Sequence, residues 1–205
     1  MAKIPTATTP SASRTYTIAL CGLSIALLTV ASWITVPLGP VPFTLQTFML
    51  VFIVLALTPR QAVISVLGYL ALGAIGVPVF AGMSGGAAQL MGPSGGFLIG
   101  FGLGAMLAAI MLRAWPEPAC ERPAGKRLSR LRTCCAAIIV LAASYLCGWV
   151  QFMVVVNVGP LEAFAMAIAP FIVLDLIKAA LAASMARTLK SAVPALRNAA
   201  GKPRA

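Results

Sequence analysis

Two charged residues stand inside an apolar segment near the end of the chain. Asp175 and Lys178 lie in the run FIVLDLIKAA, and 164–186 carries no other charge. Residues three apart share one face of a helix, so the carboxylate and the ammonium can pair. If this helix crosses a bilayer, each charge near its middle costs about 2.5–3.5 kcal/mol. Pairing between the two side chains, or a polar ligand, must therefore compensate for that cost.

Three interpretations of this pair stay open from the residues alone. The first is an intrahelical ion pair with a purely structural role. The second is a ligand site in which Asp175 accepts hydrogen bonds from N–H groups of a ligand and Lys178 pairs with a carboxylate of that ligand. The third is a proton relay in a coupled carrier. Counted from Phe164, Asp175 lies roughly 16 Å into the helix at 1.5 Å per residue, which is near the middle of a bilayer.

The composition predicts the elements that position this pair. Of 205 residues, 60% are hydrophobic and 9% are charged, a balance that excludes a water-soluble domain. Each membrane span takes about 20 apolar residues. We therefore expect an all-α polytopic membrane protein with a disordered segment at 1–15, a membrane domain at 16–186 and a basic tail at 187–205. Its six transmembrane helices are expected at about 16–36, 44–57, 62–76, 97–112, 133–156 and 164–186.

The basic residues indicate the orientation of these helices. The net charge is +11, and fourteen of the fifteen Lys and Arg residues fall in alternate connections. Two precede the first helix, one is Arg60, six lie in 113–132 and five follow residue 186. The positive-inside rule then predicts that both termini are cytoplasmic. Anionic lipid on the cytoplasmic side attracts the same basic residues. Nucleic-acid binding is not needed to explain the charge, and Lys178 is the one basic residue that no connection explains.

Two uncharged segments are predicted on the outer side. PLGPVPF spans 37–43, and 77–96 holds six glycines and two prolines. Irregular backbone at membrane depth survives only where protein or a cavity satisfies its polar groups, and glycine permits close approach to a ligand. Ordinary tight connections stay the alternative. The stretch GPSGG lacks the phosphate-loop pattern, so any ATP-driven work must come from a partner.

Other side chains could line the same cavity or could simply pack. Histidine is absent, and we expect the five cysteines to be small buried apolar residues. Cys134 and Cys135 are adjacent and lack metal-ligand spacing, so we expect no metal and no cofactor. Gly22 and Ala26 form a small-xxx-small pair that permits close helix approach. The aromatic and amide candidates are Phe80, Phe97, Tyr145, Trp149, Gln46, Gln89, Gln151 and Asn157.

Four motifs occur in order within about 19–183: PLGPVPFTLQTF, YLALGAIGVPVFAG, GPSGGFLIGF and PFIVLDLIK. In order and spacing they resemble the BioY family, the biotin-specific S components of energy-coupling factor (ECF) transporters. The resemblance implies a six-helix protein of the bacterial cell (inner) membrane that captures biotin from outside and performs no covalent chemistry. It also implies partners: a transmembrane coupling (T) component and a pair of ABC-type ATPases.

The resemblance further implies roles for residues. The family's Asp-x-x-Lys falls on Asp175 and Lys178, and its docking face for the coupling subunit would include Gly22 and Ala26. Ser94 and Phe97 stand where the family usually has Thr and Tyr. The expected substrate-binding residues are Asp175, Lys178, Gln89, Ser94, Gly95, Gly96, Phe97, Phe80, Tyr145 and Gln46.

Other functions stay open at this level. A stand-alone, ATPase-independent carrier of biotin or a similar small carboxylate, including a proton-coupled one, predicts uptake without coupling subunits. A membrane transferase with Asp175 as base needs a nucleophile or a metal cluster, and the sequence shows neither. A purely structural scaffold leaves the charged pair without a purpose. The sequence does not decide whether the chain forms a homo-oligomer.

Overall fold

The structure, a computed structural model, describes residues 10–37, 39, 41–115 and 123–192. Most of these residues are helical, as the composition predicts. The elements are α1 (Pro10–Trp33), β1 (Thr35–Val36), β2 (Phe43–Thr44), α2 (Gln46–Ala56), α3 (Pro59–Ala74), the 3₁₀ turn η1 (Ala81–Met83), α4 (Ala87–Met91), α5 (Gly95–Ala114), α6 (Pro123–Val156), α7 (Pro160–Ala167) and α8 (Ala169–Ala192).

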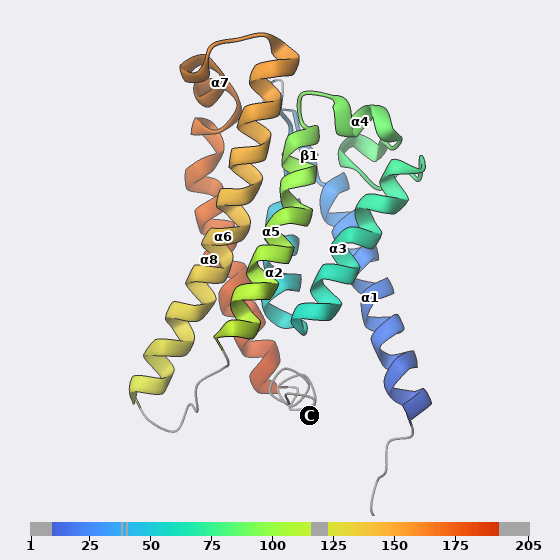
Figure 1. Cartoon of the computed structure of the whole chain (residues 1–205), viewed down its shortest axis with the longest axis vertical. Helices are drawn as coiled ribbons and strands as arrows, with labels where there is room; N and C mark the ends of the chain where they lie inside the picture. Colours follow the sequence, from blue (N-terminus) through green and yellow to red (C-terminus); the bar gives the residue numbers. More distant parts are fainter. Residues whose placement is uncertain (1–9, 38, 40, 116–122, 193–205) are drawn as a thin grey trace, which may run out of the picture.

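The helices form one bundle with two distinct ends (Figure 1). The β1–β2 hairpin, α4 and α7 lie at one end, where α5 and α8 begin. The first turn of α1 and the last turn of α8 lie at the other end. Helix α2 supplies much of the core: Leu50, Val51, Ile53 and Val54 are each at most 1% exposed, and α2 packs against α8. The short helix is thus enclosed by longer ones.

Four described helices are long and apolar enough to cross a membrane. They span Arg14–Trp33, Gly95–Ala114, Arg127–Val156 and Ala169–Ala192. Many large apolar side chains on their outer faces are exposed, such as Ile138, Val154 and Val173. Such surfaces suit a bilayer, because lipid tails are as apolar as these side chains. The structure therefore fits a helical membrane protein, and six spans stay a prediction, since α2 has 11 residues and α3 has 16.

The first helix differs from its expected bounds. Helix α1 begins at Pro10 and ends at Trp33, so part of the predicted N-terminal segment is helical. Helix α1 does not extend to Val36 as predicted, because Thr35 and Val36 pair with Thr44 and Phe43 in an antiparallel hairpin. The predicted disorder of 1–9, and the tail beyond Ala192, lie outside the described residues.

The last expected span is also divided. Helix α7 ends at Ala167, Ile168 has non-helical angles, and α8 begins at Ala169. Pro170 lies in the first turn of α8, where its missing N–H has no intrahelical partner to lose. Asp175 therefore lies six residues, roughly 9 Å, into its helix, and the depth of roughly 16 Å counted from Phe164 is wrong.

Candidate functional site

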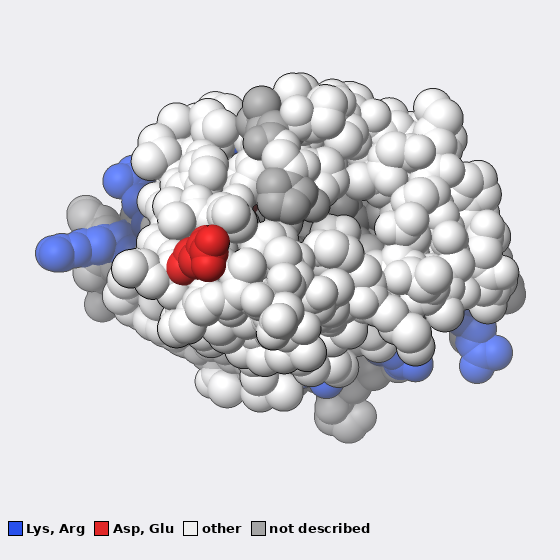
Figure 2. Space-filling model, turned by 90° about the horizontal axis from the view of Figure 1, so that it is seen from above, with Lys and Arg blue, Asp and Glu red and all other residues white. Residues whose placement is uncertain are grey.

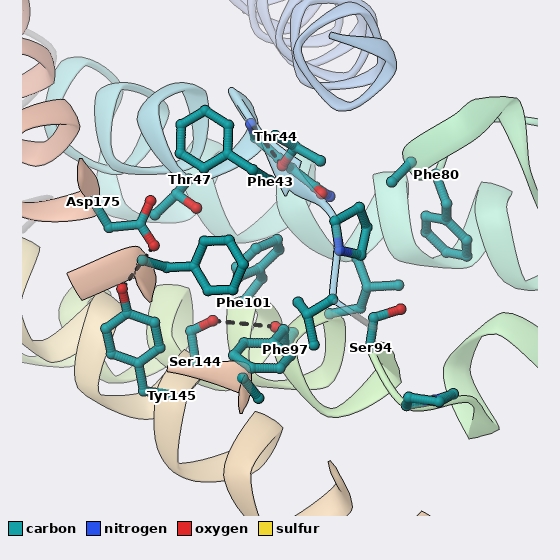
Figure 3. A pocket seen from close by; sticks show the side chains of 18 of the residues that line it. Phe43, Thr44, Thr47, Phe80, Ser94, Phe97, Phe101, Ser144, Tyr145 and Asp175 are labelled. Atoms are coloured by element: carbon teal, nitrogen blue, oxygen red, sulfur yellow. Dashed lines mark hydrogen bonds between the residues drawn. The ribbon is translucent and has the colours of Figure 1, made fainter. Parts of the chain in front are cut away.

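A cavity of about 330 Å³ opens among the elements at the hairpin end (Figure 3). Its wall combines the β1–β2 connection, α2, the segment from Phe80 to Ser94, α5, α6, α7 and α8. This volume falls in the range of roughly 300–1,000 Å³ that small-molecule sites occupy. Because these elements are far apart in sequence, only the folded bundle creates the cavity.

Asp175 and Lys178 form a buried ion pair in the cavity wall. The Lys178 Nζ lies 2.9 Å from the Asp175 Oδ1, and the two residues are 7% and 6% exposed. The same ammonium donates a hydrogen bond of 2.6 Å to the Thr44 carbonyl oxygen and lies 3.6 Å from the Phe43 ring centroid. The ammonium thus makes one favourable contact within α8 and two that connect α8 to strand β2.

Tyr145 of α6 completes the surroundings of the carboxylate. Its hydroxyl donates a 2.7 Å hydrogen bond to the Asp175 Oδ2, so both carboxylate oxygens accept a hydrogen bond (Figure 3). The residues alone suggested Tyr145 only as a cavity-lining aromatic. The structure adds a specific role for its hydroxyl, which stabilises the buried negative charge.

Six aromatic side chains also line the cavity, together with several Ser, Thr and Gln side chains. Phe43 stacks on Phe171 with ring centroids 6.3 Å apart, and Phe97 meets Tyr145 edge to face at 6.4 Å. Phe80 packs edge to face on the buried Tyr69 at 5.5 Å. The site therefore offers one anion and one cation at one side of a chamber lined by aromatic rings and uncharged polar side chains. Such a chamber can take a small molecule with an apolar body and polar groups of both kinds.

A buried polar network supports the cavity wall around Phe80. The Gln46 Nε2 donates to the Tyr69 hydroxyl at 2.8 Å, and that hydroxyl donates to the Val79 carbonyl at 2.9 Å. Ser32 of α1 donates to the same carbonyl at 2.6 Å. Helices α1, α2 and α3 are thereby joined to the backbone that carries Phe80, so this aromatic wall has a fixed position.

The structure brings eight of the ten expected substrate-binding residues to this one cavity. Gly95 and Gly96 do not line it; they lie at the start of α5 against α6. Contact of any of the ten with a ligand stays a prediction. The eight lining residues are Asp175, Lys178, Gln89, Ser94, Phe97, Phe80, Tyr145 and Gln46.

Three other candidates lie outside the cavity lining. The Trp149 Nε1 donates to the Pro160 carbonyl at 2.9 Å and so holds α7 against α6. Gln151 bonds backbone carbonyls instead of facing the cavity, and Asn157 takes a positive φ of 56° at the end of α6. These placements match the packing alternative that the sequence left open.

Sequence reasoning missed several lining residues, and a periodicity signal existed for some of them. Phe171 stands four positions before Asp175, and Phe101 stands four after Phe97, so each shares a helix face with an expected site residue. Phe43 and Thr44 lie in the PLGPVPF motif and its continuation. No periodic signal marks these two, because they belong to a two-residue strand.

The predicted docking pair lies on a different surface. Gly22 and Ala26 are both exposed on α1, and a Cβ atom at Gly22 would meet nothing within 4 Å. Among the described residues no group of three or more His, Cys, Asp or Glu could hold a metal ion. Cys21 is buried as expected, whereas Cys134 is exposed, and Cys120 lies outside the described residues.

Comparison with known proteins decides the family. The model of the BioY family matches residues 5–195. The chain belongs to the BioY family. It is 37% identical over 173 residues to the "Probable biotin transporter BioY" of Pyrococcus horikoshii, covering 84% of this chain and 95% of that protein. The "Biotin transporter BioY" of Thermotoga maritima is 36% identical over 170 residues, which is 82% of this chain and 92% of the relative.

A solved structure supports the fold of this BioY family member. The crystal structure of the S-component for biotin from an ECF-type ABC transporter matches with a TM-score of 0.76 and 25% identity, covering 90% of this chain and 95% of the other. The resemblance found in the four motifs is thereby confirmed. These relatives are transporters, not enzymes, so the transferase interpretation finds no support.

Proposed function

We propose that this chain is the substrate-binding S component of an ECF-type transporter and captures biotin from the outer side of the membrane. The observation that carries the proposal is the Asp175–Lys178 pair, buried in the wall of an aromatic cavity and supported by Tyr145. The names of the BioY relatives and of the matching crystal structure supply the ligand.

The chemistry of biotin fits this cavity. Its ureido ring offers an N–H group that can donate to Asp175 and a carbonyl oxygen that can accept from Lys178, so one end of the ligand can meet both members of a pair whose atoms lie 2.9 Å apart. The fused rings and the methylene chain suit the faces of Phe97 and Phe171. In this structure the two charges pair with each other. A ligand with both polar groups can replace part of that mutual compensation without leaving a buried charge unpaired.

The proposed topology has six passes, with α7 and α8 together forming the last, and places both termini in the cytoplasm of a bacterial cell. Two observations support it. The described Lys and Arg residues other than Lys178 occur in the helix ends and turns at the α1-start and α8-end side (Figure 1). The opposite face is almost uncharged (Figure 2), and among its described residues Glu162 of α7 is an exposed carboxylate.

Energy coupling is proposed to come from partners. The described cavity and the sequence contain no phosphate-binding loop, so a T component and ABC ATPases would supply the work of ATP hydrolysis. Helix α1 would receive the T component around Gly22 and Ala26, where small exposed residues permit close approach of another helix.

Equilibrium binding of radiolabelled biotin to the purified, detergent-solubilised chain tests the proposal. We expect tight binding that falls by more than tenfold, or about 1.4 kcal/mol, in both Asp175→Asn and Lys178→Ala. Glu162→Gln removes an exposed carboxylate and serves as the control, with unchanged affinity. Tight binding in all variants would return the pair to a structural role, and no binding by the parent chain would refute biotin as the ligand.

A further inference from the structure

The Gln151 side chain of α6 holds a backbone segment that is distant in sequence. Nothing in the sequence alone indicates this contact. The Gln151 Nε2 donates to the Leu90 carbonyl at 2.7 Å and to the Gly92 carbonyl at 2.9 Å. A primary amide nitrogen has two N–H groups, so each carbonyl receives one. The Leu90 carbonyl lies in the last turn of α4 and the Gly92 carbonyl in the connection between α4 and α5, 61 and 59 residues away from Gln151 in sequence.

The end of α4 and this connection form one wall of the cavity. Gln89, Pro93 and Ser94 line the cavity, and the two carbonyls that Gln151 holds stand next to Gln89 and Pro93 in the chain. Helix α4 has only five residues and no side-chain cap at its N-terminus, so it contributes little stability of its own. The shape of this wall therefore depends on contacts with α6.

The paired glycines of GPSGG make room for this contact. A Cβ atom at Gly95 would overlap the Leu90 carbonyl and lie 2.7 Å from the Gln151 Nε2. A Cβ atom at Gly96 would overlap the Cys147 carbonyl and lie 2.7 Å from the Gln151 Cβ. A side chain at Gly96 would push α5 away from α6, and one at Gly95 would push α5 away from the end of α4 and displace the Gln151 amide. The two glycines thus serve the approach of Gln151 to the segment.

The same face of α6 continues this arrangement toward the charged pair. Ser144, Gly148 and Gln151 lie at helical spacing. The Ser144 hydroxyl donates to the Phe97 carbonyl at 3.4 Å, and the Phe97 ring occupies the space where Gly148 lacks a side chain. One turn of α6 therefore holds the wall segment, the next holds Phe97, and Tyr145 on the adjoining face reaches Asp175.

We propose that Gln151 is a positioning residue for ligand capture, which fixes the 89–94 wall of the cavity without touching the ligand. The inference rests on the proposed binding of biotin in this cavity. Without the two hydrogen bonds, the segment 89–94 populates conformations in which this wall of the cavity is not formed. The apparent affinity then falls in proportion to the competent fraction.

Gln151→Met tests this role, because methionine keeps the length of the side chain and removes both donors. Gln61→Met is the matched control: Gln61 is also a buried amide with hydrogen bonds, but it caps the start of α3 far from the cavity. We expect biotin affinity to fall by about tenfold in Gln151→Met and to stay within twofold in Gln61→Met. The thermal midpoint should fall in both variants.

Hydrogen–deuterium exchange supplies a local readout. We expect faster exchange of backbone amides in 86–97 for Gln151→Met than for the parent, and recovery of slow exchange at saturating biotin. Gln151→Asn keeps the amide, but its side chain is one methylene too short to reach both carbonyls. If Gln151→Met cannot be purified from membranes, Gln151→Asn should show the same lower biotin affinity and the same faster exchange of 86–97.

Two results would overturn the inference: unchanged affinity and exchange in both Gln151 variants, or an equal loss of affinity in Gln61→Met. If the parent chain binds no biotin, the proposed function fails instead, and the exchange of 86–97 still decides whether Gln151 holds this segment.

Discussion

Removing the cation of the buried pair should destabilise the protein more than removing both charges. In Lys178→Met the Asp175 carboxylate, only 6% exposed, keeps a hydrogen bond from Tyr145 but loses its counter-charge. The variant also loses the hydrogen bond to the Thr44 carbonyl and the contact with the Phe43 ring. In the double variant Asp175→Asn/Lys178→Met these last two contacts stay lost, but no unpaired charge is left.

The two costs can be set against each other. Breaking a buried ion pair by removing one partner costs about 3–5 kcal/mol, mainly through the charge left behind. One hydrogen bond is worth about 1 kcal/mol and a cation–π contact about 0.5–1 kcal/mol or more. We therefore expect Lys178→Met to lose about 4 kcal/mol of unfolding free energy and the double variant to lose about 2 kcal/mol.

Denaturant-driven unfolding in mixed detergent micelles, followed by circular dichroism, measures these differences. The parent, both single variants and the double variant complete the cycle, so the coupling of the two side chains is obtained directly. The sign of one comparison is decisive. A double variant less stable than Lys178→Met would show that the unpaired Asp175 carboxylate does not destabilise Lys178→Met, and the electrostatic reasoning would be refuted.

Three further predictions concern single substitutions. Tyr145→Phe should weaken biotin binding about tenfold in the radioligand assay, because Asp175 loses a charge-assisted hydrogen bond worth about 1.5 kcal/mol; unchanged affinity would contradict this role. Gly148→Ala should lower stability by about 1–3 kcal/mol in the same unfolding assay, since its Cβ would lie 2.5 Å from the Phe97 ring. Gly22→Ala, in open space, is its control and should be neutral; an equal loss would argue against overpacking. Gly22→Leu should leave biotin binding intact and abolish co-purification with the coupling subunits, and retained co-purification would exclude this docking face.

Much of the helical framework could be predicted because membrane helices leave a direct signal in composition. Apolar runs of sufficient length located the interiors of α1, α5, α6 and α8, and the family resemblance was confirmed by the comparisons. Helix ends were less accessible to prediction. The break at Ile168 and the start at Pro10 depend on local backbone geometry, and hydropathy averages over it.

The residues of the candidate site also differ in how far the sequence could predict them. Asp175 and Lys178 stood out because charge is costly in an apolar helix, and that signal needs no tertiary structure. The hydroxyl of Tyr145 on Asp175 and the amide of Gln151 on the Leu90 carbonyl bring together residues 30 and 61 positions apart. Such contacts depend on how helices pack, so a single sequence could only propose these side chains as candidates. The role of Gly95 in making space for a neighbouring side chain was hidden for the same reason.

The nearly uncharged surface at the hairpin end has a consequence for the speed of capture. A carboxylate ligand that approaches this end meets neutral side chains and the exposed carboxylate of Glu162, while Lys178 is buried beneath the surface. Long-range attraction, which accelerates association by factors of about 10–10³ in proteins with charged clefts, is not available here. The association rate constant should therefore be nearly independent of ionic strength. Capture at low ligand concentrations would then depend on slow release from the cavity, which makes residence time the property that its buried contacts determine.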